Sequence, residues 1–339
     1  MCWSSGCTSC GSSDGRLHEF LKKRTKPPYP VYNNLSRYEQ LKKYHEYAKH
    51  IPTQKENLPY FFVFDWELDT DWAECVHMWL MDHWPLSFVF AALYLILVFW
   101  GRHWMRNRPA WEMKKSLIAW NLFLSVFSIL GASRAIPEFY HSIRGNSLYY
   151  SMCLGNHLKH NPVVANWGIL FAISKVIELG DTAFIVLRKQ RLLFLHWYHH
   201  ITVLLYAWFS CAQGIPTARY FATLNYTVHA LMYPYYLARA AKIRVPRRVA
   251  MFITLFQLTQ MIFGVYANAY SYFAKKAGLH CETPWENIYV SALMYLSYFL
   301  LFLNFFIDAY IRHAFKGMKN AAAQGKSVGE ELEEYLKIN

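Results

Sequence analysis

Three histidines occupy a five-residue stretch of the chain, at His196, His199 and His200. In a helix, spacings of three and four residues place side chains on one face, so the three imidazoles would lie together. Clustered histidines can ligate a metal, or they can act as acid, base or nucleophile. The cluster therefore predicts a reactive site, and the residues around it must decide between these chemistries.

Three other apolar stretches carry polar side chains at helical spacing. An ionisable group at the centre of a bilayer costs about 2.5–3.5 kcal/mol on insertion scales, so each one needs a partner or a function. The residues concerned are Lys175, Glu178, Asp181 and Thr182 in one stretch, Asn225 and His229 followed by Met232, Tyr233, Tyr235 and Tyr236 in the next, and Thr254, Gln257 and Gln260 in the last.

These side chains must be held by apolar blocks of membrane-spanning length. The chain has 339 residues, of which 55% are hydrophobic and 17% charged, against about 25% charged in soluble domains. We expect an all-α integral membrane protein with seven transmembrane helices, at 86–105, 115–136, 164–187, 192–211, 219–238, 249–273 and 287–311. A polar, partly disordered N-terminal segment (1–85) would precede the seven-helix domain (86–312), and a short tail (313–339) would follow it.

The distribution of basic residues predicts the orientation. The ends after spans one, three, five and seven hold sixteen Lys and Arg residues, and the opposite ends hold six. The positive-inside rule places the sixteen in the cytosol and the N-terminus in the lumen. The net charge of +13 is explained by these clusters, so we do not expect nucleic acid as a partner. The six are Arg134, Arg144, Lys159, Arg219, Lys275 and Lys276; the sixteen are Arg102, Arg106, Arg108, Lys114, Lys115, Arg188, Lys189, Arg191, Arg239, Lys242, Arg244, Arg247, Arg248, Arg312, Lys316 and Lys319.

The orientation puts the polar side chains of four helices at one depth. With a rise of 1.5 Å per residue, the histidine cluster lies roughly 7–14 Å below the cytosolic surface, and His229 lies near 14 Å. Lys175, Glu178 and Asp181 fall at roughly 9–18 Å on the same scale. We therefore expect a buried polar chamber that opens toward the cytosol.

Two predictions concern the lumenal side. Asn34, in the sequence Asn-Leu-Ser, becomes a candidate for glycosylation. Cys153 and Cys281 fall in two lumenal loops, where they can either form a disulfide or remain two thiols.

Metal and nucleophile chemistry remain alternatives for the histidines. His-x-x-His-His also occurs in membrane di-iron desaturases and hydroxylases, but those need about eight histidines and the spans supply four. A single metal with Glu178 or Asp181 as a further ligand stays open. No cysteine falls in the cytosol-facing half of the spans, so an acyl-enzyme intermediate would have to form on a histidine.

From span one to span seven the chain resembles the very-long-chain fatty acid elongases, the 3-oxoacyl-CoA synthases of the endoplasmic reticulum. Four motifs in order carry the resemblance: Lys175-x-x-Glu178-x-x-Asp181-Thr182, His196-x-x-His199-His200, Asn225-x-x-x-His229-x-x-Met232-Tyr233-x-Tyr235-Tyr236, and Thr254-x-x-Gln257-x-x-Gln260. Arg191 stands where members specific for polyunsaturated chains tend to have Gln. The chain is therefore most similar to the branch that acts on saturated and monounsaturated chains.

The resemblance implies condensation of an acyl-CoA with malonyl-CoA in a polar chamber joined to an acyl tunnel. It implies that His199 attacks the acyl thioester with help from His196 and His200, while His229 assists the malonyl-derived enolate. Asn225 and Gln257 would donate to developing oxyanions, and Lys175, Glu178 and Asp181 would complete the catalytic set. Direct condensation with histidine acting only as a base is the alternative. The expected substrate-binding residues are Tyr233, Tyr235, Tyr236 and Gln260 in the chamber and Arg188, Lys189, Arg191, Lys242 and Arg244 at the phosphates of CoA.

No metal or other cofactor is expected, and the expected partners are the two CoA substrates and the lipid bilayer. A homodimer, or contact with other enzymes of the elongation cycle, is compatible with the resemblance. Two rival functions stay open: a histidine-box desaturase or hydroxylase, and a seven-helix receptor or transporter without catalysis.

Overall fold

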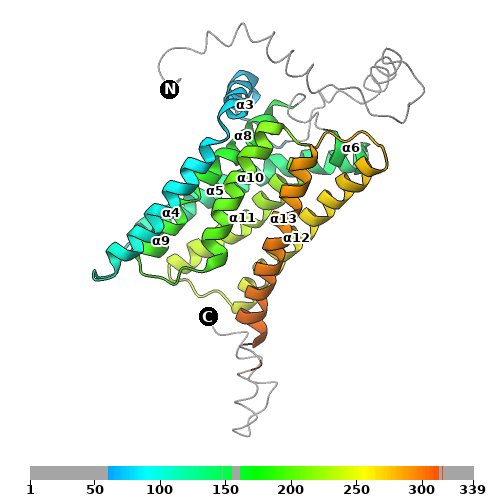
Figure 1. The fold of residues 1–339 in the computed structure, drawn as a ribbon. Helices are drawn as coiled ribbons and strands as arrows, with labels where there is room; N and C mark the ends of the chain where they lie inside the picture. The colour runs from blue at the N-terminus through cyan, green and yellow to red at the C-terminus, as the bar shows by residue number, and fades with distance from the viewer. Residues whose placement is uncertain (1–59, 147, 155–160, 313–314, 316–339) are drawn as a thin grey trace, which may run out of the picture.

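A computed structural model describes residues 60–146, 148–154, 161–312 and 315 of the chain. Every regular element within these residues is helical. The long helices lie side by side, with α3 and α6 at one end of the bundle and the C-terminal ends of α4 and α9 at the other (Figure 1). In chain order the elements are η2 (Asp65–Leu68), α3 (Thr70–His83), α4 (Leu86–Met105), α5 (Lys114–His141), η3 (Ser142–Asn146), α6 (Leu148–Cys153), α8 (Pro162–Ile177), α9 (Gly180–Leu187), α10 (Phe194–Gln213), α11 (Ala218–Ala240), α12 (Arg247–Lys276), α13 (Trp285–Phe306) and η4 (Ile307–Arg312).

Four of the helices in the described residues are long and apolar enough to cross a membrane: Leu86–Met105, Lys114–Arg144, Arg247–Lys276 and Trp285–Arg312. Helices also occupy the other three predicted spans, but α8 is only 16 residues long. The helices α10 and α11 carry His, Asn and Tyr residues, which lower their mean hydropathy. The three segments that fall short as membrane spans therefore carry three of the four polar motifs, and the fourth lies on α12, which meets both criteria.

The predicted third span is not one continuous helix. The structure divides it into α8 and α9, with Glu178 and Leu179 between them. Across this break the backbone hydrogen bonds join residues three apart instead of four apart, as between Asp181 N and Glu178 O at 3.1 Å. Trp120 of α5 packs against the break, where a Cβ on Gly180 would lie 2.7 Å from the indole. The break therefore lies in a tightly packed contact between α5 and the segment that carries Glu178 and Asp181.

Apolar side chains cover the outside of the bundle, and polar side chains lie inside it. On α4, Leu93, Ile96 and Leu97 are at least half exposed, whereas Tyr94 is buried. The interior holds Lys175, which is 1% exposed, together with Glu178, Asn225 and His229. This arrangement is the reverse of a soluble protein and is typical of a multi-pass membrane protein.

The helices α5 and α11 form the most extensive pair in the bundle. They approach closely at Gly131, where an added Cβ would overlap the ring of Tyr226. Tyr226 in turn donates to the backbone oxygen of Trp167 on α8 at 2.9 Å. This contact fixes α5, α8 and α11 relative to one another.

The end of the N-terminal segment is more structured than the sequence suggested. Residues 60–83 form η2 and α3, and α3 packs on α8 and α10 through Ala73 and Leu80. Glu67 is fully buried against Arg134 of α5. Asn34 and the tail 313–339 apart from Phe315 lie outside the described residues.

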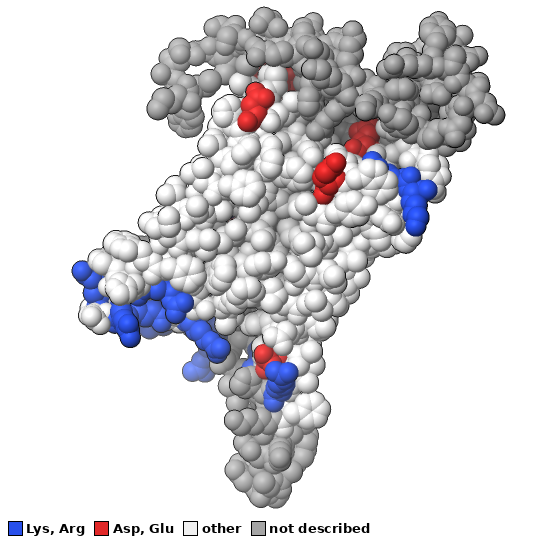
Figure 2. Space-filling model, viewed as in Figure 1, with Lys and Arg blue, Asp and Glu red and all other residues white. Residues whose placement is uncertain are grey.

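Charge is distributed unevenly along the bundle. Figure 2 shows Lys and Arg gathered at the end where α4 terminates and again near the end of α13. Two of the six basic residues counted at the opposite end, Arg134 and Arg219, are buried inside helices and paired with carboxylates. The exposed charge asymmetry is therefore larger than the sequence count indicated.

Candidate active site

A cavity of about 320 Å³ lies among α9, α10, α11, α12 and α13. All three polar stretches identified in the sequence contribute to its wall, together with the histidine cluster. We call this cavity the chamber. The predicted site residues that line it are Glu178, Asp181, His196, His199, His200, Asn225, His229, Tyr233, Tyr235, Tyr236, Gln257 and Gln260.

The three histidines of α10 face the chamber as their spacing predicted. The rings of His196 and His200 lie 4.4 Å apart between centroids, and those of His199 and His200 lie 5.7 Å apart. His200 is 7% exposed, and its Nδ1 has no hydrogen-bond partner among the described residues. His199 packs against Tyr298 of α13, with ring centroids 4.8 Å apart.

Lys175 does not line the chamber but holds two residues that do. Its Nζ donates to Glu178 Oε1 and to Asn225 Oδ1, both at 2.7 Å. Glu178 Oε1 also accepts from the Ser174 hydroxyl at 3.0 Å and lies 3.8 Å from His229 Nδ1. Asn225 Nδ2 donates to His229 Nε2 at 3.3 Å, because an amide nitrogen can only donate and Asn225 Oδ1 already accepts from Lys175. Lys175 therefore links α8 to α11 and neutralises a buried carboxylate.

Asp181 is fixed by two aromatic side chains. The indole of Trp120 donates to Oδ1 at 2.6 Å, and the hydroxyl of Tyr233 donates to Oδ2 at 3.0 Å. Both carboxylate oxygens are thus occupied by donors from α5 and α11. This arrangement orients Tyr233 and leaves Asp181 as an acceptor within a hydrogen-bonded network.

Sequence reasoning missed three residues that contact the motifs. Tyr94 of α4 lies 2.7 Å from the Thr182 hydroxyl, Trp120 holds Asp181, and Tyr298 packs on His199. Tyr94 stands in the middle of an apolar run and not at an end, where aromatic residues of membrane helices usually gather. That position was the available signal for Tyr94, whereas Trp120 lies near the start of its span and Tyr298 is one of many aromatic residues in its helix.

The predicted CoA-binding residues do not line the chamber. Arg191, Lys242 and Arg244 are exposed at the basic end of the bundle. Lys189 has a positive φ of 52° at the turn after α9 and donates to the backbone oxygen of Arg106 at 3.2 Å. Arg188 caps the C-terminus of α9. These cations surround the end of the bundle nearest the chamber, outside its wall.

A second and narrower cavity, about 100 Å³, continues from the chamber. The two share His199, Asn225, Gln260 and Met261 as lining residues. The narrow cavity runs between α10 and α11 past Tyr206 and Phe221 to Gly214 and Arg219 near the far end of both helices. His199 therefore stands at the junction of a polar space and an apolar one.

The described residues contain no group of three His, Cys, Asp or Glu side chains placed to hold a metal ion. Both carboxylates that could have joined the histidines in such a site have other partners. Asp181 accepts from Trp120 and Tyr233, and Glu178 accepts from Ser174 and Lys175. Both carboxylates are thus held by donors from the protein.

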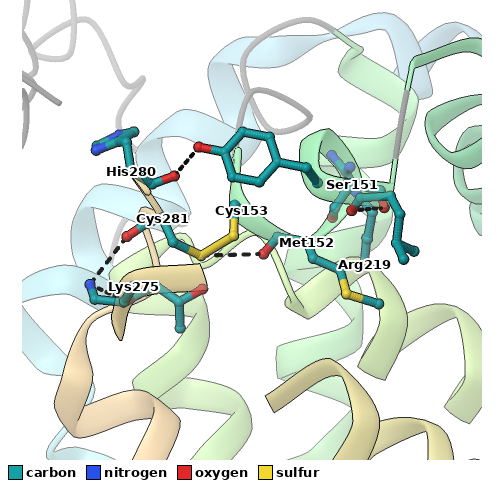
Figure 3. The surroundings of a disulfide bond; sticks show 10 residues. Ser151, Met152, Cys153, Arg219, Lys275, His280 and Cys281 are labelled. Atoms are coloured by element: carbon teal, nitrogen blue, oxygen red, sulfur yellow. Dashed lines mark hydrogen bonds between the residues drawn. A yellow bond between two sulfur atoms is a disulfide. The ribbon is translucent and has the colours of Figure 1, made fainter. Parts of the chain in front are cut away.

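A disulfide closes the end of the bundle opposite the chamber. It joins Cys153 of α6 to Cys281 in the turn before α13, 128 positions later in the sequence (Figure 3). Lys275 Nζ donates to the backbone oxygens of Cys281 and Thr283 at 3.1 and 2.9 Å. Arg219 Nη1 donates to Ser151 O at 3.1 Å (Figure 3). Of the two possibilities for this cysteine pair, the structure has the bond.

The same end holds a buried ion pair that is fully hydrogen-bonded on its carboxylate. Arg134 Nε and Nη2 donate to Glu67 Oε1 and Oε2 at 2.8 and 3.1 Å. Trp167 Nε1 and Phe64 N add donors at 2.6 and 2.8 Å. Burial alone would raise the pKa of the Glu67 carboxyl, but these donors outweigh it and hold that pKa below its usual value.

Comparison with known proteins was made on the sequence. Residues 79–318 match the sequence model of a family described as ELO: GNS1/SUR4 family. A Drosophila melanogaster protein named very long chain fatty acid elongase 6 is 44% identical over 254 residues, which are 74% of this chain and 80% of that protein. The human protein of the same name is 48% identical over 69% of this chain and 87% of its own length. Human very long chain fatty acid elongase 3 is 38% identical over 74% and 91%.

Proposed function

The chain belongs to the ELO family, and from that premise we propose that it condenses a long-chain acyl-CoA with malonyl-CoA to give 3-oxoacyl-CoA, CO₂ and CoA. It is a fatty acid elongase, an acyltransferase of the condensing type. One observation carries the choice of His199 as its centre. That residue lines both the polar chamber and the narrow apolar cavity, so a thioester carbonyl beside it would have its chain on one side and its CoA on the other.

The first step transfers the acyl group to the enzyme. A neutral ring nitrogen of His199 attacks the thioester carbonyl, the C–S bond breaks, and the imidazole proton leaves with the CoA thiolate as a thiol. His196 and His200 stand beside the reacting ring. An acyl-imidazole remains reactive toward carbon nucleophiles, which suits an intermediate that must be consumed at once.

The second step forms the new carbon–carbon bond. Malonyl-CoA loses CO₂, the enolate carbon attacks the acyl carbonyl, and the C–N bond to His199 breaks. The departing ring takes up one proton from solvent, which gives 3-oxoacyl-CoA and free His199. Asn225 and His229 line the chamber together with His199 and belong to the Lys175 network, so they can donate to the enolate oxygen. Both steps balance without a metal or redox group, so we propose that the enzyme needs neither.

We propose that the acyl chain of the substrate enters the second, apolar cavity. Its lining between His199 and Arg219 is chiefly aromatic and aliphatic, with Phe221, Tyr226, Met261 and Met294 among the side chains. We propose that it takes saturated or monounsaturated chains, since Arg191 stands where polyunsaturated-specific relatives tend to have Gln. The cations Arg188, Lys189, Arg191, Lys242 and Arg244 would meet the phosphates of CoA at the basic end.

The basic end of the bundle supports an orientation in the endoplasmic reticulum membrane. With that end in the cytosol, the N-terminus is lumenal, the C-terminus is cytosolic and all seven helical segments cross the bilayer. The Cys153–Cys281 disulfide then falls in the lumen, the compartment that favours disulfides. Asn34 would be available for glycosylation there. A homodimer or contact with other enzymes of the elongation cycle would leave this orientation unchanged.

The test is an assay of membranes that contain the full chain. Labelled malonyl-CoA and acyl-CoAs of about twelve to twenty carbons are supplied without a reductant, with His199→Ala as the matched control. A 3-oxoacyl product two carbons longer than the acyl substrate, absent from the control, supports the proposal. Turnover that requires oxygen and an electron donor would indicate a desaturase or hydroxylase. Binding without a product at any chain length would indicate a receptor or transporter.

A further inference from the structure

A chain of three hydroxyl and imidazole groups connects α4 to the histidine cluster. The phenol oxygen of Tyr94 lies 2.7 Å from Thr182 Oγ1, and Thr182 Oγ1 lies 2.9 Å from His196 Nε2. Tyr94 is 5% exposed and Thr182 is fully buried, so water does not compete for these bonds. The chain reaches the chamber from a helix that contributes none of the chamber's lining residues.

The partners of each group fix the positions of the hydrogens. Among the described residues, the phenol of Tyr94 has one hydrogen-bond partner, Thr182. A buried donor left unpaired costs about 1–3 kcal/mol, so the phenol donates its hydrogen to Thr182. Thr182 Oγ1 then accepts one bond and has its own hydrogen to give.

The hydrogen of Thr182 goes to His196. Several other helical threonines donate to a backbone oxygen four residues earlier, as Thr227 does to Thr223 O at 2.7 Å. Thr182 has no such bond; its contacts are Tyr94 and His196. Nε2 of His196 must therefore accept, and a neutral imidazole that accepts at Nε2 carries its proton on Nδ1.

We propose that Tyr94 is a positioning residue for the condensation reaction, which acts through Thr182 to hold His196 as the Nδ1–H tautomer. The inference rests on the proposed function. It assigns His196 a donor role: its Nε2 lone pair is engaged by Thr182, and its other nitrogen can only donate. His196 therefore does not attack the thioester, and the open nucleophile of the cluster is His199.

The consequences for catalysis follow from the fixed tautomer. Without the Tyr94 hydroxyl, Thr182 can turn its hydrogen elsewhere, and His196 Nε2 can then carry the proton. In the fraction of the molecules in which it does, His196 Nδ1 would lack the proton that it donates beside His199. We expect turnover to fall about ten- to a hundredfold while substrate binding changes little, because supporting hydrogen bonds of this kind act on orientation.

The experiment compares four variants of the full chain in the condensation assay. Tyr94→Phe removes one oxygen, Thr182→Val removes the relay hydroxyl, and Thr182→Ser keeps it. Tyr220→Phe is the matched control, because Tyr220 is also a buried tyrosine 2.7 Å from a side-chain hydroxyl, that of Ser151, and lines neither cavity. Melting temperatures in detergent accompany every measurement.

We expect kcat to fall about ten- to a hundredfold in Tyr94→Phe and Thr182→Val, with KM within about twofold of the unmodified enzyme. Thr182→Ser and Tyr220→Phe should keep kcat within about twofold, and Tyr94→Phe combined with Thr182→Val should be no slower than Thr182→Val alone. Equal kcat in Tyr94→Phe and Tyr220→Phe overturns the inference, as does a Thr182→Ser variant as slow as Thr182→Val. If Tyr94→Phe does not fold, the Val and Ser variants decide alone. Absence of product from the unmodified chain would instead refute the proposed function and remove this inference with it.

Discussion

The bundle buries charge in two regions, and only one of them is built like an active site. Near the disulfide end, Glu67 and Arg134 are 0% and 2% exposed, and both carboxylate oxygens accept bonds from Arg134 and from neighbouring donors. Beside the chamber, Lys175 and Glu178 are buried as deeply. The histidines near them face a cavity, and His200 Nδ1 has no hydrogen-bond partner in the described residues. The comparison teaches that burial of charge in a membrane helix does not by itself identify a site. Polar side chains that line a cavity do.

The comparison predicts that substitutions in the two regions have opposite signatures. In the chamber, activity should fall while the fold persists. At the Glu67–Arg134 pair, stability should fall while each folded molecule stays active.

The largest expected effect is that of His199→Ala. Removing the nucleophile should lower turnover by at least about a thousandfold, equivalent to about 4 kcal/mol in the barrier. The melting temperature should change little, since His199 is partly exposed to the chamber and its ring makes no hydrogen bond in the described residues. His83→Ala, at the end of α3 remote from the chamber, is the control and should keep full activity. Retention of a tenth or more of the activity in His199→Ala would place the chemistry elsewhere.

The second effect is on stability alone. Glu67→Gln leaves the buried Arg134 guanidinium without its counter-charge and should lower the free energy of unfolding by about 3–5 kcal/mol. Thermal melting in detergent measures the loss, and activity per folded molecule should stay within about twofold of the unmodified chain. Glu67→Leu with Arg134→Met removes both charges and should recover most of the stability. If specific activity falls together with stability, the two regions are not separate.

A third effect should follow removal of the disulfide. Cys153→Ser should lower stability by about 2–4 kcal/mol, because the bond constrains an unfolded chain across 128 residues. Activity of the folded protein should persist, since the bond lies at the end opposite the chamber. Cys153→Ser and the double variant that adds Cys281→Ser should have the same melting temperature, and a reductant should change the melting temperature of neither variant. A further loss in the double variant would assign the effect to packing and not to the bond.

The smallest effect concerns pH. The pKa of Glu67 is held below its usual value in the folded protein, so its contribution to stability is complete above the unfolded pKa of roughly 4.3. This contribution to stability is lost as the pH falls through the lower pKa that the Glu67 carboxyl has in the folded protein. Melting curves from pH 7 downward should therefore show the unmodified chain converging on Glu67→Gln only at acidic pH. A gap between them that stays constant down to pH 3 would contradict the assigned linkage.

Much of the chamber was predictable because its residues repeat at helical spacing. His196, His199 and His200 lie three and four residues apart, and depth matching correctly brought them together with Asp181 and His229. Helical period and span length are local properties, so a single sequence contains them.

The remaining features depend on contacts between helices. The pairing of Glu67 with Arg134 joins residues 67 positions apart, and Tyr94 meets Thr182 across 88. Nothing in the spacing of either pair indicates which helices become neighbours. The break after Glu178 was not predicted either, although Gly180 and the polar residues around it are a local signal for one; Trp120 packs against it. Pairing across the bundle is thus what the structure adds to the motifs.

The central claim is that His199 carries the acyl group, and mass spectrometry of the protein tests it most directly. The full chain is incubated with a saturated acyl-CoA in the absence of malonyl-CoA, digested rapidly and mapped by peptide fragmentation. The account predicts an acyl adduct on His199 that is absent from His199→Ala and that disappears from the unmodified chain when malonyl-CoA is added. An adduct on His196, His200 or a cysteine, or a fully active enzyme that forms no adduct, would contradict it.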